Sequence, residues 1–411
     1  MGENVDRLRP TVEDEYDDTT SEGSTVNVDP KDEAVDGIEA LVLSFLTQLD
    51  SALKPEETQE VGSGPTRSKK KIELRIANRT KQARDGTTTV RALKFPQRFR
   101  YASSRPFAQL FRVMDIVHEA VINEVPVTKR DIYYRHASLF KTQATVDRLV
   151  DDLAATFNVG RADLNVRASP KGLLCGSCIQ IRLEDGNVIT PSDSEACLIP
   201  HAEDIAVFDV DPELSWVLIV EKEAVFQTLC SSEFTRLPEI GRGIILTGKG
   251  FPDVATRVLV KTLASNLPET IPIMALVDGD PSGLSILSTY MDGSTAMQHE
   301  NDKLAAGKRI KWVGIHLSEL SRLGVGKDSL LPMTSHDEKK AMSMLLHDAP
   351  PYPDTWRKEL VHMLHTRRKA EIEILASAHS DNSKHSGCPV QPLLSYLVNK
   401  ISLFSTNATI D

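Results

Sequence analysis

The sequence predicts a multidomain α/β protein in which a helical module precedes a parallel sheet that is covered by helices on both faces. Two patterns predict this fold class. Apolar residues recur at helical spacing through residues 105–157. From residue 214 onward, short apolar runs alternate with helical stretches, which is typical of parallel strands buried on both faces. At 411 residues the chain is long enough for two or three domains with cores of their own.

Charge is distributed unevenly along the chain. The formal net charge is −10, but residues 1–60 alone carry 17 Asp and Glu against 4 Lys and Arg. Residues 66–150 carry 19 Lys and Arg against 7 Asp and Glu, a net of +12. Such a basic block is expected where a surface neutralises nucleic-acid phosphates, and a solvated basic linker gives the same composition.

Membrane and disulfide-stapled classes do not fit the sequence. The apolar stretch Leu41–Leu46 is too short to span a bilayer, and no basic-then-apolar signal peptide precedes it. Five cysteines in a chain of this size do not make a disulfide framework. A reducing interior compartment is therefore expected, with no membrane association.

The first hundred residues are predicted to lie outside the main domains. Residues 1–65 are acidic and expected to be largely disordered, because they hold few large apolar side chains. One amphipathic helix is predicted within them at residues 37–52, where apolar residues recur at helical spacing. That helix docks either on this protein or on a partner, and the pattern does not choose between them. Residues 66–100 are predicted to form a basic linker.

The helical module is predicted to contain three helices and a hairpin. The helices are expected at residues 106–123, 128–140 and 143–157, and the Gly-rich alternating segment 165–182 predicts the β-hairpin. Three helices followed by a hairpin form the outline of a winged helix, a common DNA-docking module. We assign residues 101–200 to this winged-helix domain.

The sheet domain is predicted from residues 205–335, and a helical extension from residues 336–411. Its strands are expected at residues 216–220, 243–247, 273–277 and 311–315. Helical stretches fill the intervals between consecutive strands. Parallel strands require such crossovers, so the order of the elements supports the parallel sheet.

Acidic residues follow two of these strands. Glu221 comes directly after the first strand, and Asp278 and Asp280 come after the third. Residues two apart in extended backbone point the same way, so the two aspartates are expected to project together. Ligands of open α/β sheets bind at the carboxyl ends of the strands, where three carboxylates repel one another unless a cation is present. We therefore predict that Glu221, Asp278 and Asp280 bind Mg²⁺.

A tyrosine in the helical module is predicted to be exposed. At about 100° per residue, Ile132 faces the buried side with Tyr133 close to it. Tyr134 points away from that side, next to Arg130 four residues earlier. The pattern indicates an exposed phenol beside a guanidinium group.

These residues carry a family resemblance. Three segments of the sheet domain look like a Toprim domain, the metal-binding fold of topoisomerases and primases: VEKEAVF (220–226), TGKGFPD (247–253) and VDGDPSG (277–283). Together with RDIYY (130–134) they resemble the A-type chain of topoisomerase VI. The nearest branch is its eukaryotic relatives, which make the double-strand breaks that start meiotic recombination. The resemblance runs from about residue 100 to residue 400.

The resemblance implies a type IIB topoisomerase-like reaction on two domains, a catabolite-activator-like winged helix and a Toprim domain. Tyr134 would attack a DNA phosphodiester and stay linked to the 5′ end, with Arg130 beside the reacting phosphate. Glu221, Asp278 and Asp280 would hold Mg²⁺. Lys249 and Phe251 lie on the loop after the second predicted strand, where we expect them to contact DNA. A turn lysine and a packing phenylalanine would give the same pattern.

The resemblance also implies partners and a location. Double-stranded DNA would be the substrate of a homodimer in which the tyrosine of one protomer meets the metal site of the other. Other meiotic break proteins and a topoisomerase VI B-like subunit would assist, in the nucleus. Two other interpretations stay open: a Toprim nuclease or primase-like enzyme in which Tyr134 is incidental, and a DNA-binding scaffold that kept the fold and lost activity.

Overall fold

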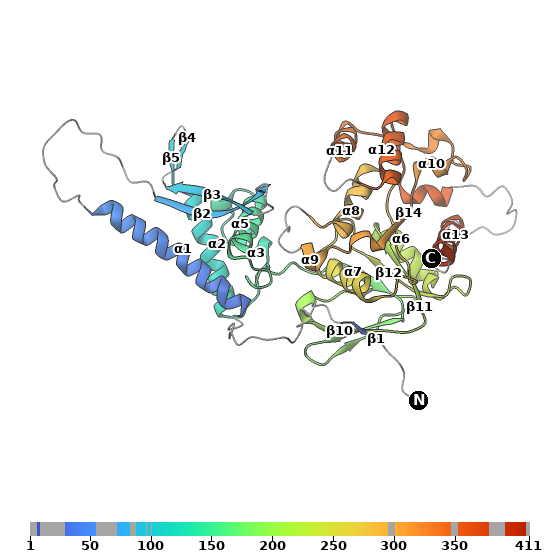
Figure 1. The fold of residues 1–411 in the computed structure, drawn as a ribbon, viewed down its shortest axis with the longest axis horizontal. Helices are drawn as coiled ribbons and strands as arrows, with labels where there is room; N and C mark the ends of the chain where they lie inside the picture. Colours follow the sequence, from blue (N-terminus) through green and yellow to red (C-terminus); the bar gives the residue numbers. More distant parts are fainter. Residues whose placement is uncertain are drawn as a thin grey trace, which may run out of the picture. The chain divides into compact units, whose positions relative to one another are not determined.

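The computed structural model describes residues 6–8, 29–54, 72–82, 88–95, 97–99, 101–294, 301–346, 352–377 and 391–407. They form two compact units (Figure 1). The smaller unit contains the helical module up to Ser169, and the larger contains the sheet domain from Pro170 onward together with strand β1 (Asp6–Leu8). The predicted boundary at residue 200 is therefore wrong, because residues 170–200 pack with the sheet domain. No helix in these ranges is long and apolar enough to cross a membrane.

The smaller unit is built from helices and one long hairpin. Its elements are α1 (Pro30–Leu53), β2 (Ile72–Gln82), β3 (Thr88–Phe95), β4 (Gln97–Phe99), β5 (Tyr101–Ser103), α2 (Arg105–Ile122), α3 (Lys129–Arg135), α4 (Ala137–Phe140) and α5 (Gln143–Phe157). Apolar side chains of α2, α3 and α5 form one core, to which α1 adds Ala34 and Ile38.

The prediction of a basic linker at residues 66–100 is wrong where β2 and β3 pair as an antiparallel hairpin. Ile72, Leu74 and Ile76 are buried at every second position, and the residues between them point outward. This period of two is a strand pattern. The hairpin packs on α1 and α5, so the basic side chains of this stretch stand on a folded ribbon.

Helix α1 contains the predicted helix 37–52 and begins earlier, at Pro30. Asp29 caps it by accepting a hydrogen bond from the backbone N–H of Lys31 at 2.9 Å. Phe45 packs against Phe107 of α2, with ring centroids 5.6 Å apart, and against Phe95 of β3 at 5.7 Å. The helix therefore docks on this protein. Of the predicted disordered stretch, residues 1–5, 9–28 and 55–65 lie outside the described residues.

The helix predicted at residues 128–140 is broken at His136, where φ is −144° and ψ is 49°. A straight helix would turn about 80° between Ile132 and Phe140, eight residues later. The break lets both side chains be fully buried.

The hairpin predicted at residues 165–182 is wrong. Its two strands belong to different sheets of the larger unit: β6 (Leu173–Cys175) pairs with β12 (Arg242–Thr247), and β7 (Ile179–Leu183) pairs with β10 (Ile205–Val210). Gly176, at φ +124°, separates them. A Cβ there would lie 2.6 Å from the carbonyl oxygen of Gly243, so the chain turns where only glycine fits against the central sheet.

The central sheet has the order β14-β13-β11-β12-β6-β9. Four strands are parallel: β11 (Leu214–Val220), β12, β13 (Ile273–Leu276) and β14 (Ile310–Gly314). Strands β6 and β9 (Cys197–Leu198) add an antiparallel edge. The predicted parallel sheet is thus a mixed sheet, because β6 pairs antiparallel with both β12 and β9, and no crossover helix lies between β6 and β9. A second sheet has the order β1-β10-β7-β8, with β8 at Val188–Ile189.

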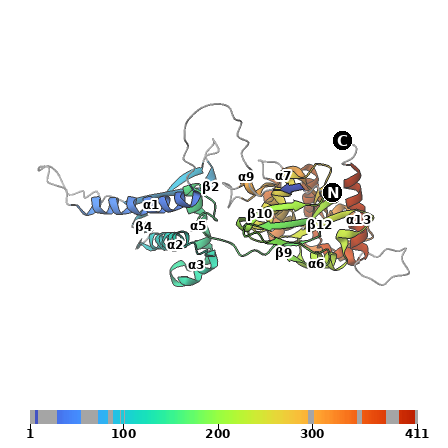
Figure 2. The same cartoon turned by 90° about the horizontal axis from the view of Figure 1, so that it is seen from below.

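Helices cover both faces of the central sheet. Helix α6 (Glu223–Ser231) lies on one side of it and α7 (Val254–Asn266) on the other (Figure 2). The remaining helices are α8 (Pro281–Met291), α9 (Asn301–Leu304), α10 (Leu317–Leu320), α11 (Ser335–Leu345), α12 (Asp354–Thr366) and α13 (Gln391–Asn407). Strands β15 (Leu331–Pro332) and β16 (Arg368–Lys369) pair beside them.

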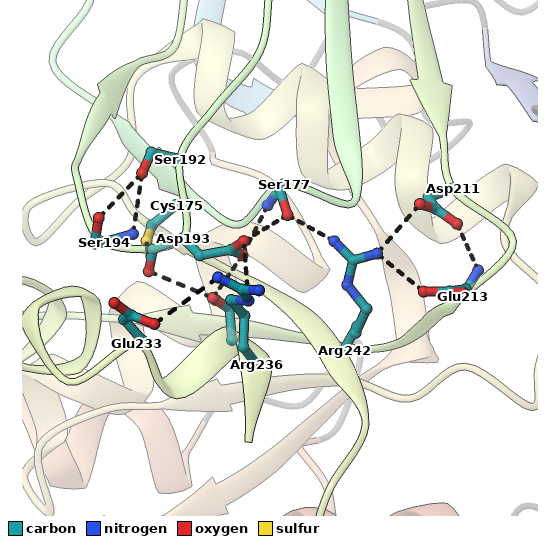
Figure 3. Close-up of polar contacts among 11 residues, drawn as sticks. Cys175, Ser177, Ser192, Asp193, Ser194, Asp211, Glu213, Glu233, Arg236 and Arg242 are labelled. Atoms are coloured by element: carbon teal, nitrogen blue, oxygen red, sulfur yellow. Dashed lines mark hydrogen bonds and ion pairs between the residues drawn. The ribbon is translucent and has the colours of Figure 1, made fainter. Parts of the chain in front are cut away.

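The antiparallel edge is fixed by a polar network around Asp193 (Figure 3). Its carboxylate accepts hydrogen bonds from the backbone N–H of Ser177 at 2.9 Å and from the hydroxyl of Thr235 at 2.9 Å. Arg242 of β12 donates to the Ser177 hydroxyl at 2.7 Å and pairs with Glu213 at 2.9 Å. Burial alone would raise the pKa of Asp193. Hydrogen bonds from the Ser177 hydroxyl, the Ser177 backbone N–H and Thr235 outweigh burial and lower the pKa.

Candidate active site

The carboxyl ends of β11 and β13 bring two acids together. The strands are neighbours in the sheet, so Glu221 and Asp278 leave it side by side. The backbone N–H of Asp278 donates a 2.8 Å hydrogen bond to Oε2 of Glu221. The backbone N–H of Glu221 in turn donates to the carbonyl of Leu276 at 3.0 Å.

Asp280 belongs to the same cluster and also caps a helix. Its Oδ1 accepts hydrogen bonds from the backbone N–H groups of Ser282 and Gly283, both at 2.8 Å, at the start of α8. Pro281 occupies the first turn of that helix, where a missing N–H costs nothing. Asp280 is close enough to Glu221 and Asp278 for its charge to raise the pKa of each.

Burial and repulsion from neighbouring acids disfavour ionisation of Glu221 and Asp278. Burial raises the pKa of Glu221 to about 7, and the charges of Asp278 and Asp280 act in the same direction. Burial likewise raises the pKa of Asp278 to about 6, against the hydrogen bond from Ile372 and the charge of Lys222. Hard oxygen ligands that repel one another are the donor set that a divalent cation stabilises.

Two lysines that sequence reasoning did not single out contact the cluster. Lys222 Nζ lies 3.3 Å from Asp278 Oδ2, and Lys369 Nζ lies 3.6 Å from Asp280 Oδ2. Lys222 follows Glu221 directly, and acids and bases alternate along residues 221–223. This alternation is the sequence pattern that could have identified Lys222. Lys369 lies about 90 residues beyond the aspartates, and no local pattern connects them.

The segment after α12 closes one side of the cluster. The predicted helical extension is interrupted here, because α12 ends at Arg367, whose φ is +52°. Gly279 and Ala370 then exchange backbone hydrogen bonds of 2.9 and 3.1 Å. The backbone N–H of Ile372 donates to Asp278 Oδ1 at 2.9 Å. The protein thereby holds the aspartate in one orientation.

The cluster fits a cation by its chemistry, although its oxygens already hold protein donors. Within the described ranges, no three His, Cys, Asp or Glu side chains are arranged to hold a metal ion. The three predicted ligands instead accept from backbone N–H groups or face a lysine. A bound ion would therefore have to compete with these partners.

A side chain at Gly283 is predicted to destabilise the packing around the cluster. A Cβ at this position would lie 2.4 Å from the Asp278 carbonyl oxygen and 3.1 Å from Glu221 Oε2. Because the first contact is with backbone, Gly283→Ala should lower the free energy of unfolding by about 1–3 kcal/mol, measured by denaturant titration. Gly326→Ala is the matched control, since no atom lies within 4 Å of its Cβ. Equal stabilities of the two variants would contradict the packing argument.

In the smaller unit, the phenol of Tyr134 is 66% exposed, as predicted. Tyr133 is half-buried against the core, and its hydroxyl donates to the Lys141 carbonyl at 3.5 Å. Arg130 is exposed one turn before Tyr134 on α3. A capping box between Thr128 and Asp131 starts this helix, so both side chains project from a defined helix start.

A buried ion cluster holds the start of α3. Asp151 of α5, which is 5% exposed, pairs with Lys129 of α3 and with Arg161 Nε at 2.7 Å. Burial lowers the pKa of Lys129, and the neighbouring Arg161 adds to this, against the pull of Asp151. Asp151 therefore pairs with two cations at the start of the helix that carries Tyr134.

Asp151→Ala should destabilise the smaller unit by about 3–5 kcal/mol, because it leaves two half-buried cations without their shared partner. Thermal unfolding of the full chain, followed by circular dichroism, measures the effect. Asp50→Ala is the control: Asp50 pairs with Lys54 on the surface, with side chains 62% and 72% exposed. Its loss should cost at most about 0.5 kcal/mol. Similar losses for both variants would show that the Asp151 cluster is unimportant for stability.

Lys249 and Phe251 lie on the loop between β12 and α7. Lys249 adopts a left-handed φ of +52°, and its Nζ pairs with Glu223 Oε1 at 3.0 Å. The ring of Phe251 is 50% exposed, with Lys340 Nζ 5.5 Å from its centroid. The structure thus gathers Glu221, Asp278 and Asp280 in the larger unit, and Arg130 and Tyr134 on one helix of the smaller unit.

Comparison with known proteins defines the class and then the family. A family model for the Toprim domain of Spo11 and the topoisomerase 6 A-type chain matches residues 216–386, and one described as "Type IIB DNA topoisomerase" matches residues 105–166. The mixed sheet with acids at its strand ends is thus a Toprim domain.

Curated relatives match across both units. "Meiotic recombination protein SPO11" of Mus musculus is 36% identical over 279 residues, which is 68% of this chain and 69% of the mouse protein. "Meiotic recombination protein rec12" of Schizosaccharomyces pombe is 37% identical over 286 residues, 70% and 76% of the two chains. The A3 chain of DNA topoisomerase 6 from Oryza sativa subsp. indica is 38% identical over 290 residues, 68% and 63%. This protein belongs to the family of Spo11 and the topoisomerase 6 A-type chains.

Proposed function

We propose that this protein is a DNA-cleaving transesterase that makes the double-strand breaks initiating meiotic recombination, through a 5′-phosphotyrosyl intermediate. The family membership and the names of the meiotic relatives support this function. The observation that carries the mechanism is an exposed phenol, Tyr134, one helical turn from Arg130. The same chain holds the Toprim acids Glu221, Asp278 and Asp280.

In the proposed reaction, the Tyr134 oxygen forms a bond to phosphorus as the bond from phosphorus to the 3′ oxygen breaks. The phenol gives up its proton, and the 3′ oxygen leaves as a hydroxyl. Arg130 donates charge-assisted hydrogen bonds to the phosphate oxygens, whose negative charge concentrates in the transition state. One phosphodiester replaces another, so the cutting step needs no ATP.

Glu221, Asp278 and Asp280 are the residues that would hold a divalent ion, which we propose to be Mg²⁺. The raised pKa values of Glu221 and Asp278 support this assignment, because a cation relieves the repulsion that causes part of the rise. When bound, the ion offsets negative charge on the phosphate and on the leaving oxygen. The acids themselves are held at their strand ends by the contacts described above.

The smaller unit is proposed to be a winged-helix DNA-binding domain of the catabolite-activator-like kind. Its helices α2, α3–α4 and α5 supply the three-helix part, and the β2–β3 hairpin is the ribbon packed on them. Lys249 and Phe251 are proposed to contact DNA from the larger unit. The active form would be a homodimer, assisted in the nucleus by other meiotic break proteins and by a topoisomerase VI B-like subunit.

Binding to DNA should weaken steeply with salt, because most contacts would go to phosphates. With about six phosphates neutralised, affinity should fall on the order of 10³-fold between 50 and 200 mM salt. Fluorescence anisotropy with a labelled duplex measures this dependence. An affinity that does not change with salt would contradict a role in DNA binding for the basic residues 66–150.

Mapping the covalent link tests the proposed function. The purified protein is incubated with duplex DNA and Mg²⁺, denatured, and separated from free DNA. Mass spectrometry should find the 5′ phosphate attached to Tyr134. Cut DNA without attached protein would favour the nuclease interpretation, and DNA that stays uncut with every metal and partner would favour the scaffold.

A further inference from the structure

Lys222 shares its ammonium group between the acidic cluster and two acids outside it. Its Nζ lies 3.3 Å from Asp278 Oδ2, 3.3 Å from Glu371 Oε2 and 2.7 Å from Glu373 Oε2. The shortest of the three contacts is with Glu373, which is not one of the proposed ligands. Lys222 therefore has a closer partner outside the cluster than within it.

The two oxygens of Asp278 have different partners. Oδ1 accepts from the backbone N–H of Ile372 at 2.9 Å, which fixes the carboxylate. Oδ2 faces Lys222. The side chain of Asp278 is buried, whereas those of Glu371 and Glu373 are 53% and 50% exposed. Lys222 therefore lies against the Asp278 oxygen that a bound cation would need, and two exposed acids already contact its ammonium group.

We propose that Lys222 competes with the divalent ion for Asp278, and that Glu371 and Glu373 hold its ammonium group when the ion is bound. This inference rests on the proposed metal site. Without an ion, the ammonium group offsets the repulsion among the buried carboxylates. With an ion, it is a like charge close to the metal and weakens binding. Lys222 is thus a positioning residue that sets metal affinity.

Lys222→Met should bind Mg²⁺ more tightly, on the order of tenfold, because one positive charge beside the site is lost. Isothermal titration calorimetry on the full chain without DNA measures the affinity directly and does not depend on cleavage. Lys400→Met is the matched control, since Lys400 pairs with Glu319 at 2.8 Å and is comparably buried, at 18% against 25% exposure for Lys222. Its Mg²⁺ affinity should equal that of the wild type. Unchanged or weaker binding by Lys222→Met overturns the inference.

Glu373→Gln tests the same idea with the opposite sign. It removes the closest partner of Lys222, so the ammonium group should move onto Asp278 and Mg²⁺ binding should weaken several-fold. This variant changes an exposed side chain, and it keeps the inference testable if Lys222→Met does not fold. Unchanged or tighter binding would refute it. Asp278→Asn separates the two claims: if Mg²⁺ binding survives that change, the proposed metal site itself is wrong.

Discussion

Tyr134→Phe should abolish covalent attachment of the protein to DNA. The substitution removes the one oxygen that is proposed to bond to phosphorus, so the rate of adduct formation should fall by at least the order of 10³-fold. The fold should not change. The ring is 66% exposed, and exposed substitutions of this size typically change stability by at most about 0.5 kcal/mol.

Tyr133→Phe is the matched control for this prediction. The two tyrosines are adjacent on α3, with ring centroids 5.3 Å apart, and each variant loses one hydroxyl. The Tyr133 ring packs on the core, and its hydroxyl makes only a 3.5 Å contact with a carbonyl. Adducts of the two variants, counted after denaturing electrophoresis of labelled DNA, should be absent for Tyr134→Phe and near the wild-type level for Tyr133→Phe. The reverse result would move the nucleophile to Tyr133.

The parts of the fold that the sequence predicted are those with a strong local pattern. The apolar run of β11 is buried along almost its whole length, and the helix expected after it forms at Glu223–Ser231. Because the chain alternates strand and helix, the ends of β11 and β13 could be placed at one edge of a parallel sheet. Glu221, Asp278 and Asp280 followed from that placement.

The parts that were missed depend on pairing between distant segments. Lys369 and Ile372 contact the aspartates from about 90 residues away, and nothing in the residues around them signals it. Strands β6 and β7 were predicted to pair with each other, since each alternates and a glycine lies between them. Each strand instead pairs with a strand of a different sheet in the larger unit. At residues 72–95, the linker prediction rested on the number of positive charges. It overlooked the alternation of side chains with a period of two, which is typical of strands.

Glu221→Gln should reduce metal-dependent cleavage on the order of 10²–10³-fold, because it replaces a charged oxygen ligand with a neutral amide. The same substitution should increase the free energy of unfolding, although it lowers cleavage. Burial and the neighbouring aspartates raise the pKa of Glu221 from 4.5 to about 7 in the folded protein. The folded state therefore binds more protons than the unfolded state between these values, and the wild-type free energy of unfolding falls as pH rises from about 4.5 to about 7.

Glutamine has the shape of glutamate and nothing to ionise, and its side-chain oxygen can still accept from the Asp278 N–H. In metal-free buffer with a chelator, Glu221→Gln should match the wild type near pH 4 and exceed it by up to about 3 kcal/mol at pH 8. Urea titrations at the two pH values measure the difference. If Glu221 served packing instead, Glu221→Gln would lower the free energy of unfolding at both pH values. A variant that is less active and more stable at pH 8 shows that the ionised carboxylate of Glu221 destabilises the fold and serves to bind the cation.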